Sequence, residues 1–150
     1  MPPAAEPDAP LRAIARGDVE WAAFTVALAG AGLPADDLGA DNQQFFALTA
    51  TRAFGGYFVS GADALLRSVI VPPSAQRRSL GTSLVTALMT RLETEGIERV
   101  WLLTVTAAPF FERLGFRQVE RAAAPVGIAA TAEFQGLCPN DAAFMFRPLK

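Results

Sequence analysis

The sequence has no histidine and a single cysteine among its 150 residues. The missing histidine excludes Ser-His-Asp and Cys-His catalysis and disfavours an ordinary zinc site. One cysteine cannot form an intrachain disulfide, which suits a reducing cytoplasm. The net charge of −2 implies no overall basic surface for nucleic acid. The longest apolar run, Trp21 to Leu33, is too short to span a bilayer.

Hydrophobic residues make up 51% of the chain, which is typical of a globular protein. We expect one domain over residues 11–150, long enough to bury roughly two-thirds of its unfolded surface. Residues 1–10 contain four prolines and predict a disordered tail. This tail lacks the basic start and apolar stretch of a signal peptide, so we expect a cytoplasmic protein with no membrane role.

The most informative segment runs from Leu65 to Glu95. Its first part, Leu65–Val71, is apolar apart from Arg67 and Ser68 and predicts a strand buried on both faces. Leucines at positions 80, 84, 88 and 92 then follow at helical spacing, and Gly96 predicts the end of that helix.

Between this strand and this helix lies a basic turn that contains Arg77 and Arg78. The unpaired N–H groups and the dipole of a helix start, together with two guanidinium groups, predict an anion site that suits phosphates. The turn matches neither a Walker loop nor the three-glycine dinucleotide fingerprint. A strand–turn–helix that binds nothing is the alternative interpretation.

Two motifs resemble the GCN5-related N-acetyltransferase (GNAT) superfamily. Residues 78–83, RSLGTS, are similar to its Q/R-x-x-G-x-G/A pyrophosphate-binding signature, although the last position is Ser83 and Arg77 stands where many members have glycine. Downstream, Trp101–Thr104 and the segment AAPFFERLGF, Ala107 to Phe116, resemble the fifth strand, the following helix and the entry to the sixth strand.

The resemblance implies an α/β fold of the GNAT acyl-CoA N-acyltransferase type, with a central mixed, twisted sheet flanked by helices and acetyl-CoA as acyl donor. It locates the reaction between Arg67–Val71 and Leu102–Thr106, on two parallel strands that splay apart. It also implies that backbone groups of Val69 and Val71 donate hydrogen bonds to the oxyanion and to the pantetheine arm. The cofactor-binding residues that it implies are Val69, Ile70, Val71, Arg77, Arg78, Ser79, Leu80, Gly81, Thr82, Ser83, Phe110 and Phe111.

No general acid or base can be named from the sequence. Family members often have a tyrosine where this chain has Phe111, and its one tyrosine, Tyr57, lies elsewhere. A thiol of pKa about 8.5 is a tolerable leaving group without strong protonation. Water relayed through Ser68, Thr104 or Thr106 is a hypothesis for proton removal, and a purely structural role is the alternative for each hydroxyl. The two threonines are also candidates for contact with the acceptor.

Arg67 is the main candidate for acceptor recognition, because an arginine inside a buried strand is costly unless it meets an anion. Its planar fork suits a carboxylate or similar oxyanion, which would make the acceptor amino-acid-like. The alternative is an internal ion pair with a carboxylate such as Glu112 or Asp63. Strand alternation predicts that Arg67 shares its face with Leu65, Val69 and Val71, with Ser68 on the other face.

Elsewhere the sequence predicts a strand over Leu11–Ala15 and a helix that Asp18 caps and Gly30 to Pro34 end. It predicts hairpin strands over Gln44–Ala50 and Ala53–Ser60, with Gly55-Gly56 marking a bulge or a close backbone approach. A further strand over Ile97 to Thr104 is expected to lie parallel to the central one. The aspartates at positions 36, 37 and 41 lack EF-hand spacing, so we predict a solvated loop and no metal.

The C-terminal part predicts a helix over Ile128 to Leu137 with Phe134 buried, then a last strand over Ala142 to Phe146. The order LLRSVIV, RRSLG, LLTVTAAPFFERLGF, APVGI and TAEFQGLCP resembles the arsenic-resistance N-acetyltransferases, a bacterial subgroup of the superfamily. That resemblance implies acetylation of a small amine acceptor, such as an arsenical or phosphinothricin-like toxin. Cys138 is either an arsenic ligand or a buried structural residue.

Two other functions stay open. Peptide or protein N-acetylation would be favoured by a wide, acidic cleft that lacks Arg67. A non-catalytic CoA-binding sensor would agree with the missing tyrosine and base. A homodimer is also left open.

Overall fold

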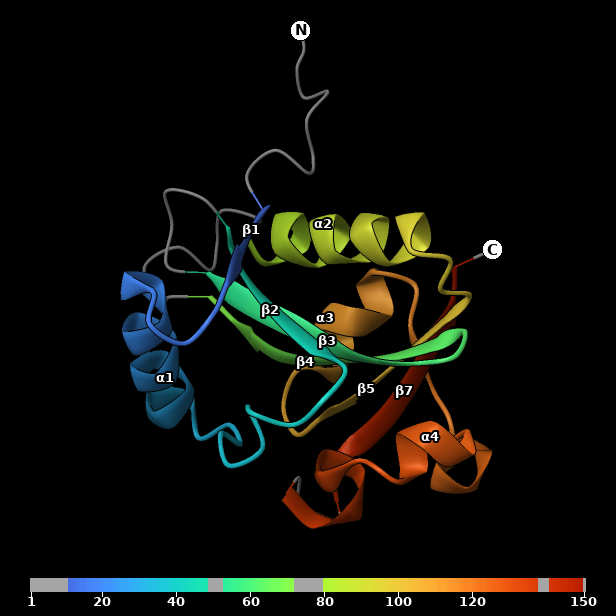
Figure 1. Cartoon of the computed structure of the whole chain (residues 1–150). Coiled ribbons are helices and arrows are strands. Elements are labelled where there is room, and N and C mark those ends of the chain that lie inside the picture. The colour runs from blue at the N-terminus through green and yellow to red at the C-terminus, as the bar shows by residue number, and fades with distance from the viewer. Residues whose placement is uncertain (1–10, 49–52, 72–79, 138–140, 150) are drawn as a thin grey trace, which may run out of the picture.

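A computed structural model describes residues 11–48, 53–71, 80–137 and 141–149. The described strands form one seven-stranded sheet in the order β1-β2-β3-β4-β5-β7-β6 (Figure 1). Neighbouring strands are antiparallel except β4 and β5, which run parallel as predicted. The elements are β1 Leu11–Ile14, α1 Val19–Ala31, β2 Gln43–Leu48, β3 Phe54–Ser60, β4 Asp63–Ile70, α2 Leu80–Thr94, β5 Arg99–Thr104, α3 Ala108–Arg113, β6 Arg117–Gln118, η2 Arg121–Ala123, α4 Val126–Ala129, η3 Glu133–Leu137 and β7 Ala143–Pro148.

Some predicted features lie outside the described residues. They are the tail at 1–10, the hairpin turn at Thr51-Arg52, the basic turn with Arg77, Arg78 and Ser79, and Cys138.

The core is divided by the sheet into two layers. On one face, α2 buries Leu84, Leu88 and Leu92 of the predicted leucine ridge against β3 and β4, together with Val85 and Met89, whereas Leu80 is partly buried. On the other face, α1 packs on β2 and β3, and α4 packs near β4, β5 and β7 (Figure 1). Because both faces of β4 are covered, its first six residues are buried, as the apolar run predicts. Among the described residues, no helix has the length and hydrophobicity of a transmembrane span.

A β-bulge interrupts β4 at Ser68. Gly56 pairs with Arg67 whereas Phe54 pairs with Ile70, so β4 holds one more residue than β3 between these pairs. Ser68 has a φ of 60°, in the left-handed region where few residues other than glycine occur. Gly55 lies opposite the bulge, where an added Cβ would lie 2.9 Å from Leu88. The sequence predicts a bulge or a close backbone approach at these glycines, and the structure has both: the bulge faces Gly55, and a Cβ atom on Gly56 would lie 2.5 Å from the backbone oxygen of Gln44.

The bulge reverses the alternation of side chains along β4. Arg67 shares the α4 side of the sheet with Leu65, whereas Val69 and Val71 pack with the α2 cluster on the opposite face. The expectation that these two valines share the face of Arg67 is wrong, because strict alternation holds only in an unbulged strand.

The C-terminal segment differs from the predicted single helix. It forms the short helix α4 and then the π-helical turn η3, and Thr131 lies between them. The Thr131 hydroxyl donates to the Ile128 carbonyl and accepts from the Phe134 amide, which replaces part of the regular helical hydrogen bonding. Phe134 is only partly buried and packs edge-on against Phe144, with ring centroids 5.3 Å apart.

Candidate active site

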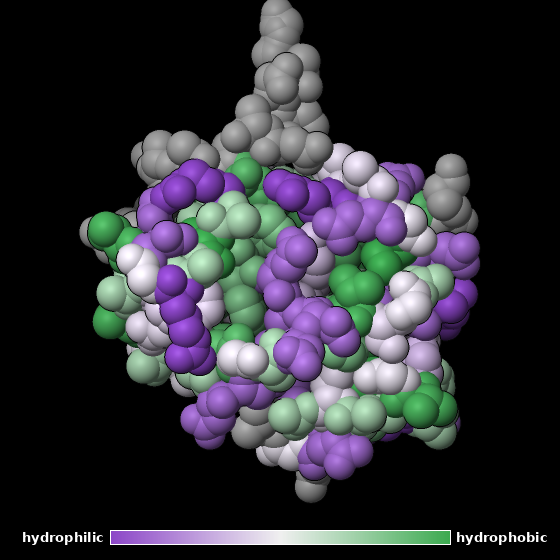
Figure 2. Space-filling model, viewed as in Figure 1, coloured by the Kyte–Doolittle hydropathy of each residue, from purple (hydrophilic) through white to green (hydrophobic). Residues whose placement is uncertain are grey.

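A cleft opens where β4 and β5 diverge. Their paired registers end at Leu66 and Leu102, although β4 continues to Ile70 and β5 to Thr104. The space between the two strands belongs to a cleft of about 990 Å³. A cleft of this size lies at the upper end of the range for small-molecule sites. On the face shown in Figure 2, hydrophobic residues gather in a hollow beside α1 that polar residues border.

The cleft brings together most of the described residues that the sequence suggests for a site. Leu80 and Ser83 do not line it, and three positions of the basic turn are outside the described residues. Residues 31–34, which end α1, form a further part of the wall that the sequence did not suggest. The predicted residues that line it are Arg67, Ser68, Val69, Ile70, Val71, Gly81, Thr82, Thr104, Thr106, Phe110 and Phe111.

Gly81 forms a narrow point in the cleft wall. A Cβ atom at this position would lie 3.3 Å from the ring of Phe110 and 3.5 Å from Val71. The start of the described part of α2 therefore lies close to both α3 and the end of β4. A glycine here keeps the backbone accessible to a ligand in the cleft.

Thr104 and Phe111, two of the candidate site residues, have structural partners. Thr104 Oγ1 accepts a hydrogen bond from the Ala107 amide at the start of α3. Phe111 is buried and packs edge-on against Phe116. Tyr57 donates to Glu95 through its hydroxyl, and burial raises its pKa. Tyr57 does not line the cleft, so it cannot act on a group bound there.

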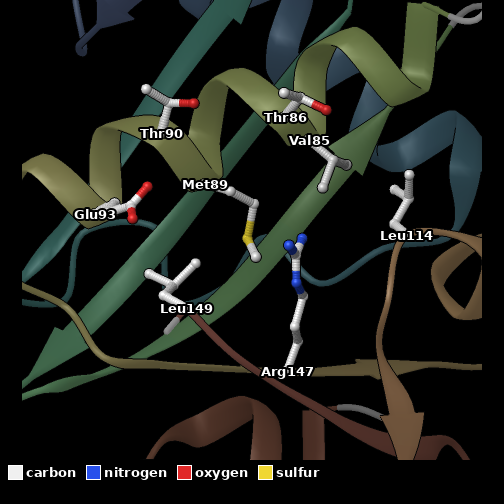
Figure 3. Close-up of a pocket in the computed structure, with 8 residues that line it drawn as sticks. All are labelled: Val85, Thr86, Met89, Thr90, Glu93, Leu114, Arg147 and Leu149. Atoms are coloured by element: carbon white, nitrogen blue, oxygen red, sulfur yellow. The ribbon is translucent and has the colours of Figure 1, made fainter.

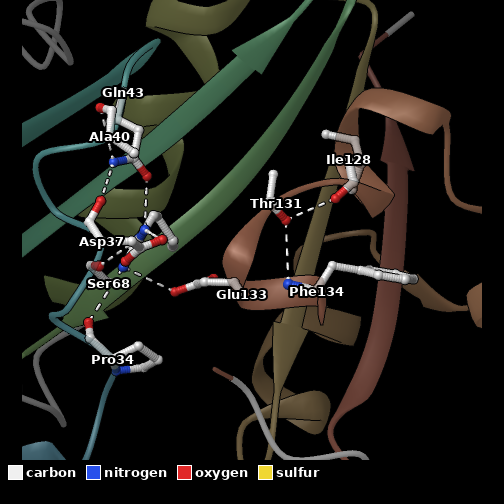
Figure 4. A network of polar contacts seen from close by, with 10 residues as sticks. Pro34, Asp37, Ala40, Gln43, Ser68, Ile128, Thr131, Glu133 and Phe134 are labelled. Atoms are coloured by element: carbon white, nitrogen blue, oxygen red, sulfur yellow. Dashed lines mark hydrogen bonds and ion pairs between the residues drawn. The ribbon is translucent and has the colours of Figure 1, made fainter. Parts of the chain in front are cut away.

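Arg67 is buried and is the centre of a polar network, and its partners Asp37, Gln43, Ser68 and Glu133 are labelled in Figure 4. Its Nε donates to Ser68 Oγ at 3.1 Å, and its Nη1 donates to Asp37 Oδ2 and Gln43 Oε1, both at 2.7 Å. Its Nη2 donates to the Pro34 carbonyl at 3.3 Å. These hydrogen bonds use four of the five N–H groups of a guanidinium.

The fifth N–H belongs to Nη2, which also forms an ion pair with Glu133 Oε2 at 3.2 Å. Asp37 and Glu133 thus share one cation, and Oδ1 of Asp37 is buried without a hydrogen-bond partner among the described residues. Burial raises the pKa of Glu133 to about 7, the nearby Asp37 carboxylate adds to this effect, and Arg67 opposes it. The network therefore has one negative charge too many when both acids are ionised.

These contacts correct two sequence predictions. The internal partners of Arg67 are Asp37 and Glu133, not Glu112 or Asp63. Asp63 instead accepts from Arg99 and from the indole of Trp101. Asp37 was predicted to lie in a solvated loop, and it is drawn into the interior because Arg67 requires an anion there. A buried arginine in the sequence indicates that an anion lies nearby, but it does not indicate which carboxylates contact it.

The pKa of Glu133 predicts a pH-dependent stability. A carboxyl whose pKa rises from 4.5 to about 7 on folding binds its proton more tightly in the folded state. The free energy of unfolding should therefore fall by about 3 kcal/mol as pH rises from 4.5 to 7, and this contribution should be constant above that range. We expect Glu133→Gln to remove this slope in urea unfolding measured across that interval. An unchanged slope would show that the pKa of Glu133 is the same in the folded and unfolded states.

A second, smaller hollow lies between α2 and the end of β7 (Figure 3). It measures about 160 Å³, below the several hundred cubic ångströms usual for ligand sites. It shares no lining residue with the cleft. We assign it no role in the chemistry.

Comparison with known proteins agrees with this geometry. The family model described as an acetyltransferase (GNAT) domain matches residues 41–118, whereas a comparison with curated protein sequences gives no match. A GNAT-family acetyltransferase from Staphylococcus aureus Mu50 is 15% identical, with a TM-score of 0.71, and the alignment covers 93% of this chain and 99% of that one.

Two further structures have the same fold. A ribosomal-protein alanine N-acetyltransferase from Escherichia coli is 23% identical, with a TM-score of 0.67 and 93% of each chain covered. N-acetylglutamate synthase from Neisseria gonorrhoeae is 16% identical, with a TM-score of 0.73, and the alignment covers 93% of this chain but 35% of the longer enzyme. These likenesses establish the fold, and the family model covers more than half of the chain. The chain therefore belongs to the GNAT family of acetyltransferases.

Proposed function

We propose that this acetyltransferase transfers an acetyl group from acetyl-CoA to the amino group of a small, amino-acid-like acceptor in the cytoplasm. The cleft between the diverging strands β4 and β5 carries this proposal. When bound, acetyl-CoA supplies a thioester whose acetyl group can pass to an amine, with CoA leaving as the thiol. Backbone groups of Val69 and Val71 would hold the pantetheine arm and the developing oxyanion. Residues 77–83 would hold the pyrophosphate.

The cleft supports an acceptor that carries an anionic group through the arginines in its wall, although Asp37 and Glu133, which do not line it, pair with Arg67. Its described lining includes Arg67 and Arg113 and no aspartate or glutamate. A peptide N-acetyltransferase that selects basic substrates would need acidic side chains in the lining of its cleft. One structural neighbour was solved with coenzyme A and N-acetyl-glutamate. An arsenical or phosphinothricin-like amino acid, which the sequence resemblance suggests, has the required amine and anionic groups.

Thiol release from acetyl-CoA tests this function. The amine panel contains glutamate, phosphinothricin and arsinothricin, with peptides that have a free N-terminus and with simple alkylamines. We expect turnover on the glutamate-like amines. Turnover on peptides alone would favour peptide N-acetylation. Acetyl-CoA binding without turnover on any amine would favour the sensor.

Gly81 offers a test of the cofactor site. Gly81→Leu would fill the space between α2, Phe110 and Val71, where even a Cβ atom is tightly placed. We expect the KM for acetyl-CoA to rise at least about tenfold, because the side chain would occupy the cleft. Thr86→Leu is the matched control, since Thr86 is exposed on the same helix and does not line the cleft. Equal KM values for the two variants would argue against cofactor binding at Gly81.

A further inference from the structure

The Arg67 network poses a problem for any acceptor that carries a carboxylate. Four of the five N–H groups donate to protein oxygens, and the nitrogen that carries the fifth is paired with Glu133. A carboxylate added to this arrangement would be the third on one guanidinium. It would also approach a buried Asp37 oxygen that already lacks a donor. One internal carboxylate must therefore withdraw or become neutral before an acceptor carboxylate can bind Arg67.

The two internal carboxylates are held unequally. Asp37 accepts a hydrogen bond from Nη1 at 2.7 Å, on the nitrogen that Gln43 also orients. Glu133 makes an ion pair at the longer distance of 3.2 Å. It also belongs to a five-residue π-helical turn rather than to the sheet. Glu133 is therefore the partner that can be replaced with less disturbance.

We propose that Glu133 occupies the place of the acceptor's carboxylate on Arg67 and gives it up when the acceptor binds. This inference rests on the proposed function for the class of acceptor, but it concerns binding and does not require turnover. Asp37, Gln43 and Ser68 would keep the guanidinium in place during the exchange. Arg67 would then act as both the structural residue and the recognition residue that the sequence leaves as alternatives.

Burial supports this exchange. A Glu133 carboxyl with a pKa of about 7 can take up a proton near neutrality. The charged groups that face it are Arg67 from β4 and Asp37 from the segment before β2. The neutral acid is a weaker partner for Arg67 than the carboxylate. Glutamate should therefore bind more tightly to the wild-type protein at pH 6.5 than at pH 8.

Calorimetric binding of glutamate to CoA-saturated protein at pH 8 tests the proposal. Glu133→Gln keeps the shape of the side chain and removes its charge. We expect this variant to bind glutamate about tenfold more tightly than the wild type. This factor corresponds to the free energy of one charge-assisted hydrogen bond. The affinity of this variant for glutamate should also be the same at pH 6.5 and pH 8. Glutamine and isoglutamine are the matched ligands, and the gain should vanish for the amide that replaces the carboxylate facing Arg67.

Asp37→Asn is the matched variant and should bind glutamate no more tightly than the wild type. A gain in Asp37→Asn but not in Glu133→Gln would overturn the choice of Glu133. Equal or weaker binding in Glu133→Gln, or no binding of glutamate to either protein, would overturn the exchange itself. Thiol release with amines that lack a carboxylate would then still support the acetyltransferase. Glutamate binding without thiol release would instead count against the proposed function alone.

Discussion

Arg67→Met is expected to lower the free energy of unfolding by about 3–5 kcal/mol at pH 8, the range for breaking a buried ion pair from one side. Methionine fills much of the same space but leaves the buried carboxylates of Asp37 and Glu133 without a cation. It also leaves the side-chain oxygen of Gln43 without its donor. Urea unfolding of the wild type and the variant measures the loss directly.

The loss should diminish at lower pH. Without Arg67, nothing opposes the rise in the pKa of Glu133 that burial causes, so protonation relieves the repulsion between the two acids as pH falls. The double variant Arg67→Met/Glu133→Gln should regain about 1–3 kcal/mol relative to Arg67→Met at pH 8. A loss below about 1 kcal/mol, or no recovery in the double variant, would contradict a network in which Arg67 balances both acids.

The sequence predicts the fold well because its signals are local. The apolar run at Leu65, the leucines of α2 and the segment that starts at Ala107 each determine one element from neighbouring residues. The crossover rule then makes β4 and β5 parallel without further information. The position of the cleft follows from these elements together with the family resemblance.

The partners of Arg67 could not be predicted in the same way. Asp37 is 30 residues away in the chain, and Glu133 follows β5 and four further helical or strand segments. A buried arginine indicates that an anion is near, but several acids satisfy that condition. The bulge at Ser68 is also invisible to alternation, because the glycines that face it lie on β3. Both features depend on contacts between distant segments.

Gly56→Ala is expected to lower the free energy of unfolding by about 2–3 kcal/mol, the usual cost of forcing extra atoms into a packed core. Gly56 lies in β3, paired with Phe45 on one side and Arg67 on the other. A Cβ atom here would lie 2.5 Å from the backbone oxygen of Gln44 and would overlap the ring of Phe45. The Gln44 oxygen belongs to the main chain of β2, so relief requires the two strands to move apart.

Gly56→Ala should also weaken acceptor binding in the cleft. The Phe45 ring lies under the guanidinium of Arg67, with its centroid 5.6 Å from Cζ. Displacing this ring should disturb Arg67, so we expect the KM for a carboxylate-bearing acceptor to rise more than the KM for acetyl-CoA. Gly30→Ala is the control, because Gly30 lies in α1 with open space around its Cβ position. It should leave both KM values unchanged and raise stability by up to about 1 kcal/mol. Thermal unfolding and steady-state kinetics on both variants separate these effects, and similar values for the two would contradict the close packing at Gly56.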